Sequence, residues 1–459
     1  MTPTATQLRQ EIIKAAGDTA TQDKIAIARS RYLVAFHEAA KQFSDLELAR
    51  KRAAFRRRKA IENLDSYLIE FEANFIKSGG KVIWAQDAAE ACSEIIAIIN
   101  RSGEKEIVKS KSLTTDEIGL DAALKEAGLD HTETDLGQFI LQVAGDKPSH
   151  MVMPALHYSK SDVGQLFHDI LGMDRSDEPE RISAFAAQRL RKKYETAGVG
   201  ITGANFLIAD PGAISITENE GNAWLATAKP RIHIAVAGID KVLPSINDLA
   251  LFLPLLSTYG TGQSLTAYNT VLRGPKRIGE TDGPGEMYVV LIDNGRSKLL
   301  KEEQQRSLAS CIRCGACLYH DPVYAVIGGK AYQSSWIGPP ATVALPFING
   351  IKSHGFMAEL STLSGADTEN CPVRINFNKI LLDSRHKILE RSGSSTSGKM
   401  FFLLWKTAML KRDIVNWKNL RTRNYFMNTI FLKSPTGARD MKKPEKESFN
   451  EWWRKKMNP

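Results

Sequence analysis

Four of the five cysteines in this 459-residue chain lie in two short segments of its last third, and their spacing restricts how those segments can fold. Cys311, Cys314 and Cys317 recur at every third position, so a single loop can turn three thiols toward one point. Cys371 comes much later and stands directly before Pro372. The chain must return to the first loop if all four thiols are to act together.

This spacing is that of the ferredoxin motif C-x2-C-x2-C-x3-C-P, in which the fourth cysteine of each of two runs ligates the other run's cluster. By that rule one cluster has its ligands present, and they are Cys311, Cys314, Cys317 and Cys371. The ligand positions of the other cluster are all replaced, and they hold Asp321, Ser361, Ser364 and Asp367. The sequence predicts one [4Fe-4S] cluster and the absence of a second.

Two other readings of the same residues remain open. Four thiolates also suit structural zinc, although zinc sites usually use two separated pairs and the Cys-Pro ending favours an iron-sulfur centre. A second cluster held by oxygen ligands is disfavoured, because these clusters select soft thiolates. The fifth cysteine, Cys92, lies in a helical pattern and is expected to be a small buried hydrophobe, so the count excludes a disulfide framework.

Charge is unevenly distributed along the chain. The net charge is +9, but residues 399–459 carry 15 Lys and Arg against 5 Asp and Glu, so residues 1–398 sum to 9 − 10 = −1. A second basic run, residues 50–59, is expected to be a solvated helix face or a subunit contact, and no nucleic-acid partner is predicted. No stretch is long and apolar enough to span a membrane, and no secretory signal is recognised, so a cytoplasmic protein is expected.

The remaining pattern predicts four regions. Residues 1–75 form a helical arm, and residues 76–300 form one α/β domain, because short β runs such as 81–84 and 106–109 alternate with helices, which is typical of parallel strands. Further strands are expected at 204–208, 213–217, 231–236 and 287–292, and helices at 86–101, 115–127, 161–171, 177–197 and 245–256.

The third region, residues 301–391, is predicted to be a helical ferredoxin-like module. The gap between the two motifs, 361 − 321 = 40 residues, exceeds the short linker of compact ferredoxins. Residues 392–459 are a linker, flexible by composition over 393–398, and a basic tail. Within the tail, residues 400–410 form an apolar helix that either docks on a partner, the favoured interpretation, or lies on an anionic membrane surface.

A ligand pocket is predicted in the α/β domain. Lys109 and Lys111 follow a strand and precede a helix, where an anion would meet free N–H groups, unless they are merely a polar loop. Asn205, Glu220 and Asn222 lie around the next short strands and either orient a ligand or form structural turns. Neither a dinucleotide-binding glycine motif nor a P-loop is present. No nucleophile and base are paired, so no catalytic residue is assigned.

From about Ala53 to Pro459 the sequence resembles the lactate utilization protein B family, the iron-sulfur subunit of bacterial L-lactate oxidation. The matching segments are residues 108–112, 133–137, 147–150, 200–206, 217–222 and 291–296. The resemblance implies a Rossmann-like domain similar to the sugar-phosphate isomerase and CoA-transferase class, followed by a ferredoxin module that normally holds two [4Fe-4S] clusters. The four replaced ligands depart from that pattern.

The resemblance implies an electron-transfer subunit of a complex that oxidises lactate or a related 2-hydroxy acid. Its partners would be a cysteine-rich redox subunit and a second protein with a lactate-utilisation domain, and the basic tail could add peripheral membrane contact. An alternative of another class is a scaffold or ligand-binding subunit whose cluster is structural. Whether the chain is itself an enzyme stays open.

Overall fold

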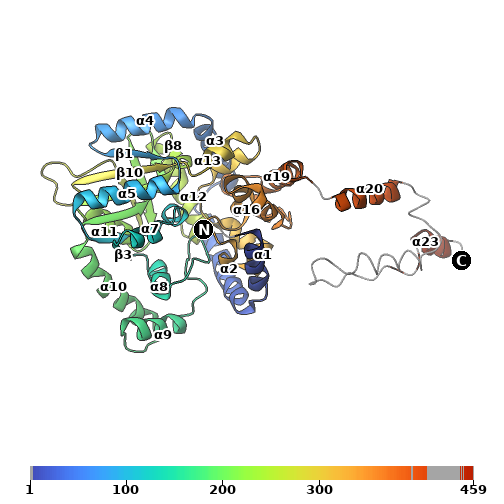
Figure 1. Cartoon of the computed structure of the whole chain (residues 1–459), viewed down its shortest axis with the longest axis horizontal. Coiled ribbons are helices and arrows are strands. Elements are labelled where there is room, and N and C mark those ends of the chain that lie inside the picture. The colour runs from blue at the N-terminus through green and yellow to red at the C-terminus, as the bar shows by residue number, and fades with distance from the viewer. Residues whose placement is uncertain (1–3, 394–395, 411–444, 446, 448, 458–459) are drawn as a thin grey trace. The chain divides into compact units, whose positions relative to one another are not determined.

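The computed structural model describes residues 4–393, 396–410, 445, 447 and 449–457. The chain divides into two compact units, Met1–Ile388 and Leu389–Pro459. Figure 1 shows the elements of both. The structure shows a mixed α/β architecture with many helices, as the sequence predicts. The four predicted regions stay a prediction.

Four helices lie within the described residues 4–77, which agrees with the helical pattern of the sequence. Their bounds are α1 Ala5–Ala16, α2 Thr19–Ala40, α3 Leu46–Glu62 and α4 Leu64–Lys77. Thr4, Asp18 and Asp45 each accept a hydrogen bond from a first-turn N–H group, which satisfies one of the free donors at a helix start. These short polar residues explain why the first three helices begin where they do.

The centre of the first unit is a six-stranded parallel sheet in the order β1-β10-β7-β4-β2-β3. The strands are β1 Lys81–Ala85, β2 Glu106–Lys109, β3 Asp130–Glu133, β4 Val199–Gly203, β7 Ile232–Gly238 and β10 Glu286–Ile292. Alternate residues of β10 face opposite sides: Val289 and Leu291 pack with α4, and Val290 packs with α5 (Ala88–Ser102). Figure 1 shows α4 and α5 covering the two faces. Cys92 of α5 is buried, as predicted.

The central strand β4 was not predicted from the sequence, which placed a strand at residues 204–208 instead. That span holds only the short strand β5 (Phe206–Ile208). Two glycines, Gly200 and Gly203, weaken the strand signal of β4, because glycine disfavours a strand interior. Gly200 is required by packing: a Cβ there would lie 1.8 Å from the carbonyl oxygen of Ala226.

A second, smaller sheet has the order β8-β5-β6-β9 and adjoins the first. Its other strands are β6 Ala213–Glu218, β8 Val242–Leu243 and β9 Tyr268–Leu272. The helices that surround the two sheets are α6 Leu113–Glu117, α7 Leu120–Glu126, α8 Leu136–Ala144, α9 Lys160–Leu171, α10 Pro179–Thr196, α11 Asn222–Ala228, η1 Ile239–Lys241, η2 Ile246–Asp248 and α12 Leu249–Thr261. The predicted helix at 115–127 is thus divided in two, at Gly119, whose φ is +68°.

The cysteine-bearing segment is helical, and none of its described residues from 301 to 392 forms a strand. Its elements are α13 Arg296–Lys301, η3 Gln305–Ser310, α14 Ala316–His320, α15 Pro322–Ile327, η4 Lys330–Tyr332, α16 Pro339–Ile348, α17 Ile351–His354, η5 Gly355–Glu359, α18 Ala366–Glu369 and α19 Phe377–Ser392. One apolar core joins it to α2, α3 and α12. The cysteine loops therefore sit in the same packed body as the α/β sheet.

The second unit contributes α20 (Thr396–Leu410) and α23 (Phe449–Met457). Helix α20 begins inside the segment predicted to be a flexible linker, and residues 394 and 395 lie outside the described residues. Six of its apolar side chains are exposed, namely Met400, Phe402, Leu403, Leu404, Trp405 and Leu410. Among the described residues no helix is both long enough and apolar enough to cross a bilayer. Most of the predicted basic tail, residues 411–444, lies outside the described residues.

Candidate functional site

The four cysteines of the two motifs line one cavity, which we call the cysteine cavity. They are Cys311, Cys314, Cys317 and Cys371. Three of these side chains are buried, that of Cys311 is half-buried, and none forms a disulfide. The structure thus brings the distant Cys371 to the loop of the other three.

The loop of the first motif has a backbone that suits this convergence. Arg313 and Gly315 both have positive φ angles, +57° and +82°, and Gly315 directly precedes α14. The backbone N–H of Arg313 donates to the Sγ of Cys311 over 3.3 Å. Left-handed residues turn the chain sharply, so successive thiols can point to the same side of the loop.

The second motif repeats this backbone without the thiols. Leu363 and Gly365 have φ angles of +53° and +84°, and Gly365 directly precedes α18. The N–H of Leu363 donates to the Oγ of Ser361 over 3.1 Å, at the position where the first motif has a sulfur. The two loops are therefore equivalent in conformation but carry different donor atoms.

The oxygen side chains at the replaced positions have local structural partners. Asp321 accepts hydrogen bonds from the N–H groups of Val323 (3.0 Å) and Tyr324 (3.3 Å) and caps α15. Burial, together with the nearby carboxylate of Asp367, raises the pKa of Asp321 to about 6, although the two backbone hydrogen bonds oppose this shift. Ser364 is exposed and accepts from the N–H of Ala366 over 3.4 Å.

Helix α3 holds the first cysteine loop through a buried arginine. Arg57 is 0% exposed and donates to the carbonyl oxygens of Ala309 (2.8 Å) and Ser310 (3.1 Å), directly before Cys311. It also donates to the carbonyls of Asp240 and Val242. All five N–H groups of an arginine are donors, so one side chain can join three segments.

The same helix holds the segment of the fourth cysteine. The guanidinium of Arg50 donates to the carbonyl of Cys371, with Nη2 at 3.0 Å and Nε at 3.3 Å, and to the carbonyl of Glu369. Glu47 balances this charge at 2.9 Å. Helix α3 thus binds both segments that supply the thiols.

These contacts correct only part of the prediction that residues 50–59 form a solvated helix face or a subunit contact, because four cations of the run are exposed, namely Lys51, Arg52, Arg58 and Lys59. Arg57 is fully buried, and Arg56 forms an ion pair with the buried carboxylate of Asp248 over 2.6 Å. The signal was present in the sequence: Ala53 and Ala60, at −4 and +3 from Arg57, place it in the middle of a small apolar stripe. Counting cations along the run obscured that stripe.

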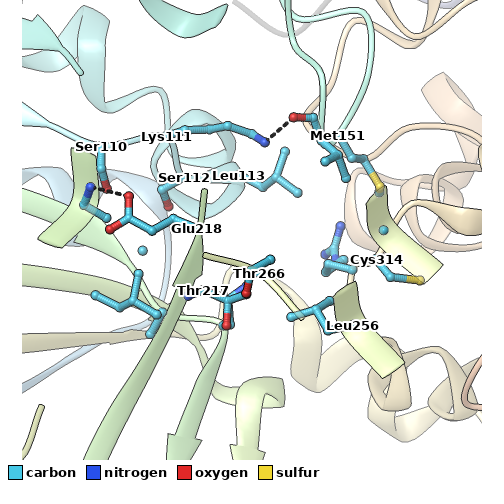
Figure 2. A pocket seen from close by; sticks show the side chains of 18 of the residues that line it. Ser110, Lys111, Ser112, Leu113, Met151, Thr217, Glu218, Leu256, Thr266 and Cys314 are labelled. Atoms are coloured by element: carbon cyan, nitrogen blue, oxygen red, sulfur yellow. Dashed lines mark hydrogen bonds between the residues drawn. The ribbon is translucent and has the colours of Figure 1, made fainter. Parts of the chain in front are cut away.

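A larger cavity of about 350 Å³ lies between the α/β part and the first cysteine loop, and we call it the polar cavity. Of the residues predicted to form a ligand pocket, it is lined by Lys111, Asn205, Glu220 and Asn222. Figure 2 shows open space with Glu218 on one side and Met151 and Cys314 on the other. Met151, Ile312, Arg313 and Cys314 line both cavities, so the polar cavity ends at the cysteine loop.

Lys109 does not line the polar cavity. Its ammonium group is buried and forms ion pairs with Glu133, with Asp121 at 3.2 Å and with Asp116 at 3.8 Å. The side chain of Lys111 extends along one side of the polar cavity, and its Nζ donates to the carbonyl of Val152 over 2.8 Å (Figure 2). The structure therefore separates two lysines that are neighbours in sequence.

The polar cavity has an acidic wall built by turns of the α/β part. Both carboxylate oxygens of Glu218 accept hydrogen bonds at the start of α11, from the N–H groups of Ala223 (2.7 Å) and Trp224 (2.6 Å). Glu220 accepts from the N–H of Leu136 over 3.0 Å. The side-chain oxygen of Asn205 accepts from an N–H of β6 over 2.9 Å. These bonds fix the wall's shape while the side chains still face the cavity.

Comparison with known proteins places this architecture in a family. A family model described as the LUD domain matches residues 68–292. Lactate utilization protein B of Anoxybacillus flavithermus is 38% identical over 464 residues, covering 98% of both chains, and that of Geobacillus sp. (strain WCH70) is 38% identical over 449 residues, covering 95% of this chain and 94% of the relative.

Among solved structures, a DUF162 family protein from Deinococcus radiodurans is 14% identical and covers 50% of this chain and 98% of its own, with a TM-score of 0.29. The matches to the curated relatives extend over nearly the whole length of both chains, including the helices before the LUD domain and the cysteine motifs after it. The chain belongs to the lactate utilization protein B family.

Proposed function

We propose that this protein is the iron-sulfur electron-transfer subunit of a complex that oxidises lactate or a related 2-hydroxy acid. The observation that carries the proposal is the convergence of four thiols, from two distant segments, on one cavity. Thiolate sulfur is the donor that iron-sulfur clusters select. The ligands would be Cys311, Cys314, Cys317 and Cys371, and the group would be one [4Fe-4S] cluster.

The protein also meets a second requirement of such a site, which is control of its surroundings. The reduction potential of an iron-sulfur cluster depends on hydrogen bonds to its sulfurs and on solvent exposure. Here the N–H of Arg313 already donates to the Sγ of Cys311, and the other three thiols are buried. Arg50 and Arg57 fix the backbone on both sides of the site.

A second cluster is not part of the proposal. Its four positions carry oxygen, and all four of those side chains already accept hydrogen bonds from the local backbone: Asp321, Ser361, Ser364 and Asp367. A serine or aspartate that caps a turn has no need of a metal to satisfy it. The retained loop conformation is then explained by packing rather than by cluster binding.

The polar cavity adds a place for a small molecule directly beside the cysteine loop. When bound, the cluster would supply a one-electron redox centre. The residues of the chain would shield that centre, through Met151 and Ile312, and orient a ligand against it, through Arg313 and the acidic wall. We propose Lys111, Asn205, Glu220 and Asn222 as ligand-facing residues; Lys109 would act only through its ion-pair cluster.

The proposal extends to the wider organisation of the protein. Its partners would be a cysteine-rich redox subunit and a second protein with a lactate-utilisation domain, and its location would be the cytoplasm. The α/β part would be related to the sugar-phosphate isomerase and CoA-transferase class, and residues 301–391 to helical ferredoxins. The exposed apolar side chains of α20 suit a helix that docks on one of these partner subunits.

The test is a redox titration of the anaerobically purified chain, monitored by electron paramagnetic resonance. We expect one signal from a reduced cluster. That signal should disappear, because the cluster is oxidised, when the partner subunits and an electron acceptor are added. The Cys371→Ser variant should lose the signal, whereas Cys92→Ser, which alters a cysteine of α5, should keep it. A cluster that is present but cannot be reduced would contradict electron transfer and support the alternative, a scaffold with a structural cluster.

A further inference from the structure

Two cationic side chains line the polar cavity close to the cysteine loop and have no anionic partner. Lys241 of η1 is 7% exposed, and Arg313 lies between Cys311 and Cys314. Neither side chain makes a hydrogen bond or an ion pair with any residue that the structure describes, and the Nε of Arg313 is fully buried without an acceptor. Buried polar groups are nearly always paired, so these two donors point to a missing ligand.

The charges around them leave a positive surplus at this end of the cavity. Arg296 forms ion pairs with both nearby carboxylates, Glu117 at 2.8 Å and Asp240 at 2.6 Å. Because Arg296 already engages both acids, Lys241 and Arg313 lack a carboxylate of their own. Burial lowers the pKa of Lys241 to about 8, with Asp240 opposing that shift, so the lysine is still mostly protonated at neutral pH.

Arg313 is also held in an orientation that suits an anion. Its guanidinium carbon lies 3.3 Å from the centre of the Trp336 ring, which stacks the planar group and leaves its N–H edge free. A guanidinium fixed in this way presents two parallel donors, the geometry that matches a carboxylate or a phosphate. The guanidinium of Arg313 and the ammonium of Lys241 together form a binding site for one anionic group.

The opposite wall of the polar cavity offers acceptors instead of donors. Asp135, Glu218 and Glu220 lie there, and Figure 2 shows Glu218 across the open space from Cys314. The charges that influence Glu220 are Asp135, Lys111 and Glu218, whereas those that influence Lys241 are Asp240, Arg313, Cys311 and Arg57. The cavity therefore has two separate ends, and carboxylates at the second end would accept hydrogen bonds from hydroxyl groups.

The polar cavity has room for a ligand larger than lactate. At about 30 Å³ for each water-sized unit, about 350 Å³ holds roughly twelve non-hydrogen atoms, about twice as many as L-lactate contains. A 2-hydroxy acid has its carboxylate and hydroxyl on neighbouring atoms and would fill only part of this volume. The ligand that fits carries its anionic group and its hydroxyl groups several bonds apart.

We propose that the polar cavity binds a polyhydroxylated organic anion larger than lactate, of the sugar-acid or sugar-phosphate type. Its carboxylate or phosphate lies between Lys241 and Arg313, beside the cysteine loop, and its hydroxyl groups donate to Glu218 and Glu220. Binding at this site does not depend on the electron transfer proposed above. A failure of one proposal therefore leaves the other standing.

The experiment is isothermal titration calorimetry on the anaerobically purified, iron-loaded chain. The probes are D-gluconate, D-glucose 6-phosphate, uncharged D-glucose, L-lactate and hexanoate, which matches gluconate in carbon number but lacks its hydroxyl groups. We expect gluconate or glucose 6-phosphate to bind at least about tenfold more tightly than glucose, lactate and hexanoate. The tighter of the two identifies the anionic group as a carboxylate or a phosphate.

Three variants then assign the site. Lys241→Met should weaken the tighter probe at least about tenfold, Lys241→Arg should restore most of that loss, and Lys192→Met, which removes an exposed lysine of α10, should change nothing. The visible absorbance of the iron centre is recorded for each variant and shows that the cysteine loop is intact. The proposal is wrong if neither anion binds, if glucose or hexanoate binds equally well, or if Lys241→Met binds like the wild type.

Discussion

The strongest prediction about stability concerns Arg57, which helix α3 inserts between the α/β part and the first cysteine loop. Replacing it with methionine keeps most of the side-chain volume but removes bonds to four carbonyl oxygens. Hydrogen bonds to a charged group contribute roughly 1.5–3 kcal/mol each, but burying the guanidinium costs several kcal/mol, which the variant recovers. Because four neutral carbonyl groups are left without a donor while the desolvation cost is recovered, we expect a net loss of about 3–5 kcal/mol in the free energy of unfolding.

The assay is urea unfolding of the anaerobically purified chain, followed by circular dichroism, with the iron content measured on the same samples. The matched control is Arg58→Met, because Arg58 is adjacent on the same helix but exposed, and surface changes usually stay within about 0.5 kcal/mol. Iron retention should fall for Arg57→Met only. A loss of less than about 1 kcal/mol, or equal losses for both variants, would refute the reasoning that α3 holds the cysteine loop.

Three further predictions follow from the two motif loops. The pKa of Asp321 is about 6 in the folded protein against 3.8 ordinarily, so the folded state keeps the proton to higher pH, and stability falls by about 3 kcal/mol in all as pH rises from about 4 to 6. Asp321→Asn keeps the cap of the helix and should remove this slope, measured by urea unfolding at a series of pH values. An unchanged slope would exclude Asp321 as its source. Cys371→Ser should abolish iron binding while Cys92→Ser retains it, and iron in both would refute the crossed ligand set. A variant with cysteines at the four replaced positions has changes at Asp321, Ser361, Ser364 and Asp367. Because the second loop keeps the backbone of the first, this variant should raise the iron content to about eight per chain. An unchanged iron content would show that loop conformation alone is not enough.

Much of this architecture follows from local pattern in the sequence. The parallel α/β sheet, the N-terminal helices and the helical cysteine segment were predicted, because each rests on periodicity or on the spacing of a motif. The convergence of Cys371 on the other three also came from the crossed-ligand rule, although the segments are far apart in the chain. A rule that relates two motifs predicts a contact between distant segments, which secondary-structure propensity cannot do.

What could not be predicted depends on contacts between distant segments. The burial of Arg57 is decided by carbonyl groups of Asp240, Val242, Ala309 and Ser310, none of which is near it in sequence. The alanines around Arg57 indicate that it faces the interior, but no local pattern identifies the carbonyl groups that it meets. The role of α3 in holding both cysteine segments was missed for that reason.

The two lysines of the predicted ligand pocket show the same limit on a smaller scale. Lys109 is the last residue of β2, and its side chain enters the ion-pair cluster of Glu133. Lys111 lies beyond the strand end, where the alternation of faces no longer applies, and reaches the polar cavity. The strand boundary decides between the two environments, and boundaries are the least predictable part of an element.

The central claim is that this chain holds one cluster, at the four converging cysteines. The most direct measurement is the iron, acid-labile sulfide and zinc content of the anaerobically purified wild-type protein, with Mössbauer spectroscopy to identify the type of cluster. The account predicts about four irons and about four sulfides per chain and the spectrum of a [4Fe-4S] centre. About eight irons per chain, or one zinc with no iron, would contradict it.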